Sequence, residues 1–261
     1  AAGLTPGAAR ALEHVARAVE GGVTRGHLVT RRAPGSLLLE LFTHAGVGTM
    51  ITADAVEKLR PAKIEDVRGM LALDTELLVV SGRQLDRFSA AGGVATLVGG
   101  ISADGMVTMA SNRASPRDVA IVVDGVYFLY EEGGSVAVGA DPDLPSPVAV
   151  TEIAGYFVFA IDDGRFFISA IDDTTIDALD FASAETNSDR NVMVSTRGRE
   201  LVIFGDRSTE FWTESGAADF PFARVQVIDV GCYAPSSVAN VLVLKPGVPA
   251  TDTLIWAASD H

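Results

Sequence analysis

The chain has 261 residues, of which 48% are hydrophobic and 21% charged, and its 34 acidic and 20 basic side chains give a formal net charge of −14. Non-specific binding to DNA depends on lysine and arginine side chains that release counterions from the phosphates, so this balance argues against a broad nucleic-acid-binding face. The hydrophobic fraction is ample for a buried core or an oligomer interface. Since no run of about 18 apolar residues is present, we expect no membrane span.

The first 66 residues predict a short α/β segment. Thr5 and Pro6 offer a helix start, apolar residues follow at helical spacing, and Gly21 and Gly22 end the run. A strand, a helix, a second strand and a short helix are expected next, at residues 25–30, 36–42, 47–52 and 54–59. This order is a β-α-β rhythm and differs from the pattern of the residues that follow.

Three stretches of this segment carry a family resemblance: LTPGAARAL, AVEGGVTRGHLV and, most specifically, LLLELFTHAGVGTMI at residues 37–51. They resemble the end of the amino-acid-kinase domain of N-acetylglutamate kinases and of kinase-like N-acetylglutamate synthases. KLRPAKIEDV, residues 58–67, is similar to the seam at which such synthases enter their acetyltransferase domain. The glycine-rich substrate segments of that family lie upstream of this part, and ALEHV at residues 11–15 replaces a lysine-bearing segment. Phosphoryl transfer depends on such positioned cations and backbone donors, so we expect none here.

From residue 67 onward the sequence repeats a plan of apolar run, tight turn and apolar run. The turns are rich in Asp and Gly, which tolerate the positive φ that a two-residue hairpin needs. The plan predicts antiparallel strand pairs at residues 76–88, 118–130, 155–169 and 199–213, and a fifth unit begins at residues 253–257. Unit starts lie roughly 40 to 50 residues apart, which is typical of propeller blades. The fold class expected is mainly β, a propeller-like array of antiparallel hairpins preceded by the α/β segment; a β-sandwich with regular hairpins is the alternative.

The amino-acid sequence of residues 67–261 contains motifs that carry a second family resemblance. VRGMLALDTELLVVSGRQLDRF, GMVTMASNRAS, the long stretch from GYFVFAIDDGRFFISA to FPFARV, and VGCYAPSSVAN occur in that order. They resemble the packaged-DNA stabilisation proteins, or tail accessory factors, of short-tailed phages. The C-terminal half of that family has no counterpart here, so this domain is expected to be incomplete at its C-terminal end.

The second resemblance implies a structural protein of the virion tail, assembled in the host cytoplasm, and no enzyme. It implies a homo-oligomeric ring, hexameric in that family, that forms a nozzle section of the tail and helps retain packaged DNA. The partners implied are the portal or adaptor and tail-needle proteins, with DNA passing nearby and no sequence-specific binding. Two other functions stay open: a fragment or relative of N-acetylglutamate kinase or synthase, and a generic β-propeller binding module. A natural fusion and a composite sequence would each explain the two unrelated resemblances.

The residue pattern predicts no catalytic residue, no cofactor and no metal. Cys232 is the only cysteine, which excludes an internal disulfide and a multi-cysteine metal site. The four histidines show no spacing that pairs a base with a nucleophile, and the Gly46-Val47-Gly48 stretch lacks the context of a phosphate loop. A cluster of aspartates could supply oxygen ligands to Ca²⁺, but turn chemistry explains it better: Asp162, Asp163, Asp172, Asp173, Asp177 and Asp180.

Two further groups of residues are candidates for contact with other molecules. Trp212, Phe220 and Phe222 form an aromatic cluster on a Gly- and Pro-bounded stretch, which indicates either a subunit interface or a blade core covered by a loop. Four arginines could line a DNA channel or serve as rim charges that balance the acidic connector: Arg190, Arg197, Arg199 and Arg207.

Overall fold

The computed structural model describes residues 6–23, 26–28, 49–51, 67–89, 95–184, 189–217, 219–245 and 248–259. The chain divides into two compact units, Ala1–Ala62 and Lys63–His261, and each is described by itself. No helix among the described residues is long and apolar enough to cross a membrane.

The first unit begins with helix α1, Pro6–Glu20, as the sequence predicts. Proline occupies its first position, where a missing amide costs no hydrogen bond. Gly22, with φ of 104°, follows its end, where the Gly21 amide donates to the Arg17 carbonyl. Val19 is the buried residue of the apolar stripe.

Two short strands complete the described part of this unit, β1 at Gly26–Leu28 and β2 at Thr49–Ile51. They pair antiparallel, so they are not the parallel pair that a β-α-β crossover contains, and the predicted β-α-β rhythm is wrong in this respect. The strands lie inside the two expected ranges. The helices predicted at residues 36–42 and 54–59 lie outside the described residues.

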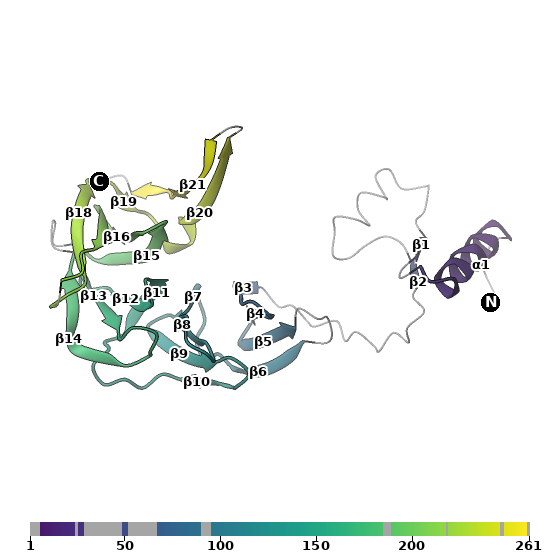
Figure 1. Ribbon diagram of the computed structural model, residues 1–261, viewed down its shortest axis with the longest axis horizontal. Helices are drawn as coiled ribbons and strands as arrows, with labels where there is room; N and C mark the ends of the chain where they lie inside the picture. Colours follow the sequence, from purple (N-terminus) through teal and green to yellow (C-terminus); the bar gives the residue numbers. More distant parts are fainter. Residues whose placement is uncertain are drawn as a thin grey trace. The chain divides into compact units, whose positions relative to one another are not determined.

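The second unit contains four antiparallel sheets of four strands, each a meander in chain order, and Figure 1 shows them following one another in an arc. The strands of the first two sheets are β3 (Val67–Ala72), β4 (Glu76–Ser81), β5 (Gln84–Ser89), β6 (Thr96–Gly100), β7 (Val107–Ser111), β8 (Asp118–Val123), β9 (Val126–Glu131) and β10 (Val136–Val138). Those of the next two are β11 (Pro147–Ile153), β12 (Tyr156–Ile161), β13 (Arg165–Ser169), β14 (Ile176–Ser183), β15 (Asn191–Arg197), β16 (Glu200–Gly205), β17 (Thr209–Glu214) and β18 (Phe222–Ile228).

All four predicted hairpins are confirmed. They are the second and third strands of the four sheets: β4 with β5, β8 with β9, β12 with β13, and β16 with β17. The residues of the turns made these hairpins predictable. Between β8 and β9, for example, Asp124 and Gly125 adopt positive φ angles of 47° and 78°, which Asp and Gly tolerate better than other residues. The fold is therefore mainly β and propeller-like, with each sheet a blade.

The residues after β18 begin a fifth unit that differs from the predicted one. Strands β20 (Ala239–Lys245) and β21 (Val248–Ile255) form a hairpin, so the strand expected at residues 253–257 is the second member of a pair. Residues Ala258–Ser259 form β22, which pairs with β19 (Gly231–Cys232) and not with β21. A short 3-10 helix, Pro235–Ser237, lies between β19 and β20.

The second strand of each inner sheet is buried on both faces. In β8, Val119, Ile121 and Val123 pack with residues of the first sheet, whereas Ala120 and Val122 pack with residues of the third. Successive side chains of a strand point to opposite faces, so one continuous apolar run supplies two interfaces. The unbroken run in the sequence follows from burial between two neighbouring sheets.

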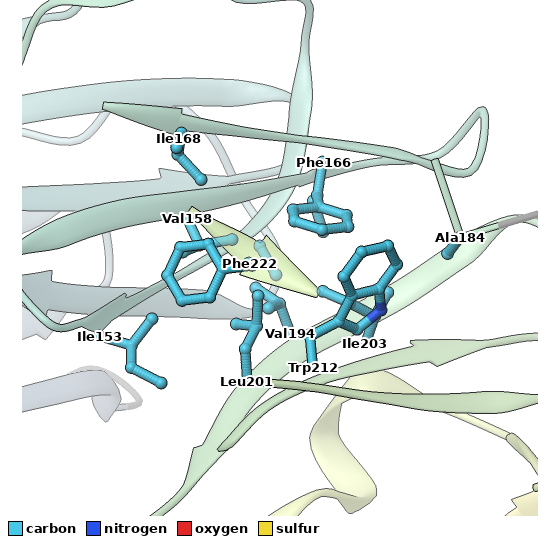
Figure 2. Packing of buried hydrophobic residues seen from close by; sticks show 12 residues of the cluster. Ile153, Val158, Phe166, Ile168, Ala184, Val194, Leu201, Ile203, Trp212 and Phe222 are labelled. Carbon is cyan, nitrogen blue, oxygen red and sulfur yellow. The ribbon is translucent and has the colours of Figure 1, made fainter. Parts of the chain in front are cut away.

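The interface between the third and fourth sheets shows how these faces interlock (Figure 2). Phe166 of β13 meets the Trp212 ring of β17 edge to face, with 5.1 Å between ring centroids. Val158 from β12 and Leu201 and Ile203 from β16 belong to the same buried cluster. The first strands contribute to it as well, through Ile153 of β11 and Val194 of β15.

Replacing Phe166 with alanine tests the contribution of this interface. We expect a loss of about 3–5 kcal/mol in the free energy of unfolding, because the fully buried ring leaves a cavity between two sheets. The matched control is Tyr233→Ala, since that aromatic side chain is 78% exposed and its removal should change stability by about 0.5 kcal/mol or less. Urea denaturation of both variants measures the difference, and equal stabilities would contradict the assigned interface.

Candidate functional site

The aromatic cluster of Trp212, Phe220 and Phe222 lies at the junction of the third and fourth sheets. Phe220 and Trp212 both contact Phe166, with centroid distances of 5.7 and 5.1 Å. Phe222 packs against Tyr156 at 5.6 Å. Trp212 and Phe222 are buried and Phe220 is partly buried, so the blade-core alternative describes their surroundings. A subunit contact at this cluster would have to use the exposed part of Phe220.

A buried carboxylate holds the tryptophan in place. Glu210 is almost fully buried and accepts hydrogen bonds from Trp212 Nε1 at 3.1 Å and from Arg224 Nη1 at 3.0 Å. The Arg224 guanidinium also lies over the Trp212 ring, 5.9 Å from its centroid. Glu210 is not among the candidates that the sequence indicates, although its spacing of two from Trp212 places both side chains on one face of β17.

The four arginines do not gather in one channel. Arg190 pairs with Asp206 at 3.1 Å, a hydrogen bond that raises the pKa of the guanidinium. Arg197 pairs with Glu200 and lies over the Phe211 ring at 4.6 Å from its centroid. Arg199 and Arg207 are exposed.

Two hollows contain three of these arginines. Arg190 and Arg207 line a space of about 490 Å³ together with Asp206 and Tyr233. A second space, of about 680 Å³, has on its wall Arg199 and the residues Arg113, Glu152, Ile153, Ala154, Thr196, Gly198, Thr213 and Glu214. Each hollow therefore contains both guanidinium and carboxylate groups. Neither presents the uniformly positive surface that binds the phosphates of a nucleic-acid backbone.

Two of the predicted acidic cluster, Asp163 and Asp173, stabilise chain turns through hydrogen bonds to neighbouring residues. Asp163 pairs with Arg165, whose hydrogen bond lowers the pKa of the carboxyl. Asp173 accepts hydrogen bonds from the Thr175 and Thr174 amides, which lower its pKa in the same way. Among the residues that the structure describes, no three Asp, Glu, His or Cys side chains converge as metal ligands.

The remaining candidates are separate from one another. His14 is exposed on α1, and the stretch Gly46–Gly48 lies outside the described residues, as do the side chains of His27, His44 and His261. Cys232 is buried, and its Sγ donates to the Ala234 carbonyl at 3.2 Å.

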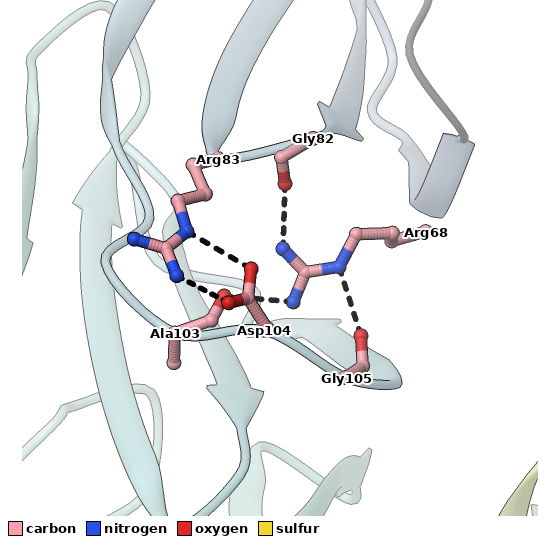
Figure 3. A network of polar contacts seen from close by, with 6 residues as sticks. All are labelled: Arg68, Gly82, Arg83, Ala103, Asp104 and Gly105. Atoms are coloured by element: carbon pink, nitrogen blue, oxygen red, sulfur yellow. Dashed lines mark hydrogen bonds and ion pairs between the residues drawn. The ribbon is translucent and has the colours of Figure 1, made fainter.

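The connectors between sheets carry polar networks that lie outside the candidate residues predicted from the sequence. Arg68 on β3 donates to the carbonyls of Gly82, Ala103 and Gly105 at 2.5, 2.9 and 2.8 Å, and Arg83 pairs with Asp104 beside it (Figure 3). One side chain thereby ties the β4–β5 turn to the connector that leads to the second sheet. No motif marks such an arginine, because its partners are backbone carbonyls brought together by folding.

Asp189, in the connector before the fourth sheet, likewise ties that connector to a turn, here the one between β16 and β17. Its Oδ2 accepts hydrogen bonds from the Arg207 amide at 2.9 Å, the Ser208 amide at 2.8 Å and Ser208 Oγ at 3.1 Å. A Cβ at Gly205 would collide with this carboxylate, which explains why glycine stands there. Among the described residues, these polar side chains therefore fix the turns and connectors of the sheets in place.

Comparison with known proteins gives two kinds of match. The family model described as "Bacteriophage P22 Gp10, beta-propeller" matches residues 44–243. An amino-acid acetyltransferase of Ralstonia nicotianae is 35% identical over 121 residues, which are 45% of this chain and 22% of that protein. One from Azotobacter vinelandii is 50% identical over 62 residues, 24% of this chain and 14% of that protein. The chain spans less than a quarter of these two relatives.

Solved structures with a similar backbone have low sequence identity. BBS1N in complex with ARL6DN has a TM-score of 0.48 at 10% identity, covering 75% of this chain and 61% of that one. YCF48 bound to D1 peptide has a TM-score of 0.48 at 12% identity, covering 80% of this chain and 68% of that one.

Replacing Asp189 with alanine tests the connector contact. Two backbone amides lose their acceptor, so we expect a loss of about 1–3 kcal/mol in the free energy of unfolding. Asp189→Asn keeps an acceptor oxygen and should lose less. The control is Asp143→Ala on an exposed connector position, which should stay within about 0.5 kcal/mol of the unmodified protein. Chemical denaturation of the three variants measures this order, and an Asp189→Ala variant as stable as the control would contradict it.

Proposed function

The chain belongs to the family of the bacteriophage P22 Gp10 β-propeller, and on that premise we propose that it is a structural protein of the phage tail that helps retain packaged DNA. The observation that carries the proposal is the family match over residues 44–243. The four stacked sheets within that range support it, since a tail component needs a rigid body that presents fixed surfaces.

The proposed role depends on shape and copy number. A nozzle around a DNA path needs identical copies about an axis, and a cyclic assembly repeats one contact until the ring closes. We propose a homo-oligomeric ring, with six copies as the family resemblance implies. Its neighbours in the virion would be the portal or adaptor and the tail-needle proteins.

The charge of the chain supports passage of DNA without binding. With 34 acidic and 20 basic side chains, the protein carries a formal net charge of −14, and an excess of negative charge repels phosphates. The arginines at Arg190 and Arg197 are paired with carboxylates, which reduces their pull on a passing backbone. A DNA path lined by such a surface allows the duplex to slide, whereas mechanical closure retains it.

Removal of the protein from assembling phage particles tests this function. Particles that lack it should package DNA and then release it, and supply of the intact chain from a plasmid should restore retention. Nuclease protection of particle DNA measures retention, while electron cryomicroscopy of the tail should find the protein as a ring of copies. Absence from the tail, a single copy per tail, or full DNA retention without the protein would overturn the proposal.

A second candidate function has its own observation. The 50% identity over 62 residues to an amino-acid acetyltransferase favours a fragment or relative of the N-acetylglutamate kinase and synthase group. Coupled assays for acetylation and phosphorylation, with an intact amino-acid acetyltransferase as positive control, separate the two candidates. We expect turnover at background; turnover above background that is lost with residues 1–66 would favour the enzyme.

A further inference from the structure

The larger of the two hollows, about 680 Å³ in volume, lies among strand ends of three neighbouring sheets. Its wall residues end or follow β7, β11, β15 and β17, which are first or third strands of the second, third and fourth sheets. Each of these sheets packs against described strands on both faces, so the hollow does not depend on where the described residues stop. Volumes of about 300–1,000 Å³ are typical of ligand sites.

One wall of the hollow has a fixed backbone and an available guanidinium. The Arg113 amide donates to Asp172 Oδ1 at 3.1 Å, whereas the Arg113 side chain is 66% exposed. Glu152, the carboxylate beside it, accepts a hydrogen bond from the Gly155 amide at 2.7 Å and lies 3.6 Å from Arg113 Nη2, beyond hydrogen-bond distance. Within the described part of the chain, the donors of the Arg113 guanidinium are therefore left for a ligand.

A second wall carries another guanidinium and a second carboxylate. Glu200 pairs with Thr213 across β16 and β17, so Arg199 and Glu214 come next at the ends of the two strands. Both side chains are exposed, and the described residues hold neither of them in an ion pair. The buried Ile153 adds an apolar side chain to the lining.

The wall groups specify what kind of ligand fits. Guanidinium groups only donate hydrogen bonds and carboxylates only accept them, so a ligand that fills the hollow must bring both acceptors and donors. A peptide backbone brings one of each at every residue other than proline, and an acidic side chain offers the pair of oxygens that a guanidinium binds in bidentate fashion. The sugar-phosphate backbone of DNA brings acceptors alone, and Glu152 and Glu214 repel its charge.

We propose that this hollow binds an extended acidic peptide segment of a partner protein. Its carboxylates bind the Arg113 and Arg199 guanidiniums, its backbone amides donate to Glu214, and an apolar side chain contacts Ile153. The net charge of −14 opposes the approach of such a segment, but salt screens this repulsion beyond about 8 Å at physiological ionic strength, so contacts inside the hollow decide binding. The inference goes beyond the proposed function, because this site operates whether or not the protein forms a ring.

Titration with two peptide mixtures tests the site. The probe is a mixture of blocked pentapeptides with glutamate at the second and fourth positions and alanine, leucine, serine or glycine elsewhere; its counterpart has glutamine in place of glutamate. NMR should show the amide signals of Ala154, Gly198 and Thr213 shifting with an apparent Kd of about 1 mM for the glutamate mixture. The glutamine mixture should need about tenfold higher concentration, because it lacks the charge-assisted hydrogen bonds.

Two variants and a control of equal charge change locate the binding. Arg113→Gln and Arg199→Gln should each weaken binding of the glutamate mixture about three- to tenfold. Arg10→Gln, at an exposed position of α1, removes the same charge and should leave binding unchanged. The amide spectra of all three should show the native fold.

Four results would overturn the inference. They are the absence of shifts at the three amides, equal binding of the two mixtures, and unchanged binding by both Arg113→Gln and Arg199→Gln. The fourth is a short DNA duplex that shifts the same amides at a lower phosphate concentration than the carboxylate concentration required of the glutamate mixture, since the hollow would then bind phosphates.

Discussion

Burial of one strand between two neighbouring sheets is the constraint on which the second unit depends. Ile121 and Val122, adjacent on β8, belong to two different interfaces. A sheet with apolar side chains on both faces cannot stand alone in water, because each exposed face leaves apolar area in contact with solvent. The sheets are therefore obliged to stack, and the array behaves as one body whose surfaces keep fixed positions.

Polar side chains add the fixed spacing that apolar contact does not supply. Arg68 and Asp189 each bind backbone groups of a turn from a connector or first strand, and Glu210 orients Trp212 inside an interface. These bonds are directional, so they limit sliding between sheets that dispersion forces alone would tolerate. Rigidity of this kind suits a protein that acts by occupying a position, and it connects the packing of the sheets to the proposed role in the tail.

Turn chemistry and unbroken apolar runs made the four hairpins predictable from the sequence, since Asp-Gly turns and runs such as residues 119–123 are local signals. Other features are not local. The partners of Arg68 lie 14 to 37 residues away and are backbone carbonyls, so no motif marks them. The aromatic residues around Trp212 show the limit of prediction from sequence. Their clustering indicates a contact region, but only the packing of the sheets shows that Phe166 is the residue Trp212 contacts. The antiparallel pairing of β1 with β2 was missed because strand direction depends on the connection between them.

Hydrogen exchange of individual amides tests most directly whether stacking makes the array one cooperative body. If it does, the amides of β8, β12 and β16 exchange slowest and at one common free energy, that of global unfolding, while the outer strands β14 and β18 open at lower cost. Separate free energies for β8, β12 and β16 would show that the sheets open independently. That result would contradict the account, because independent sheets would not depend on their neighbours for burial.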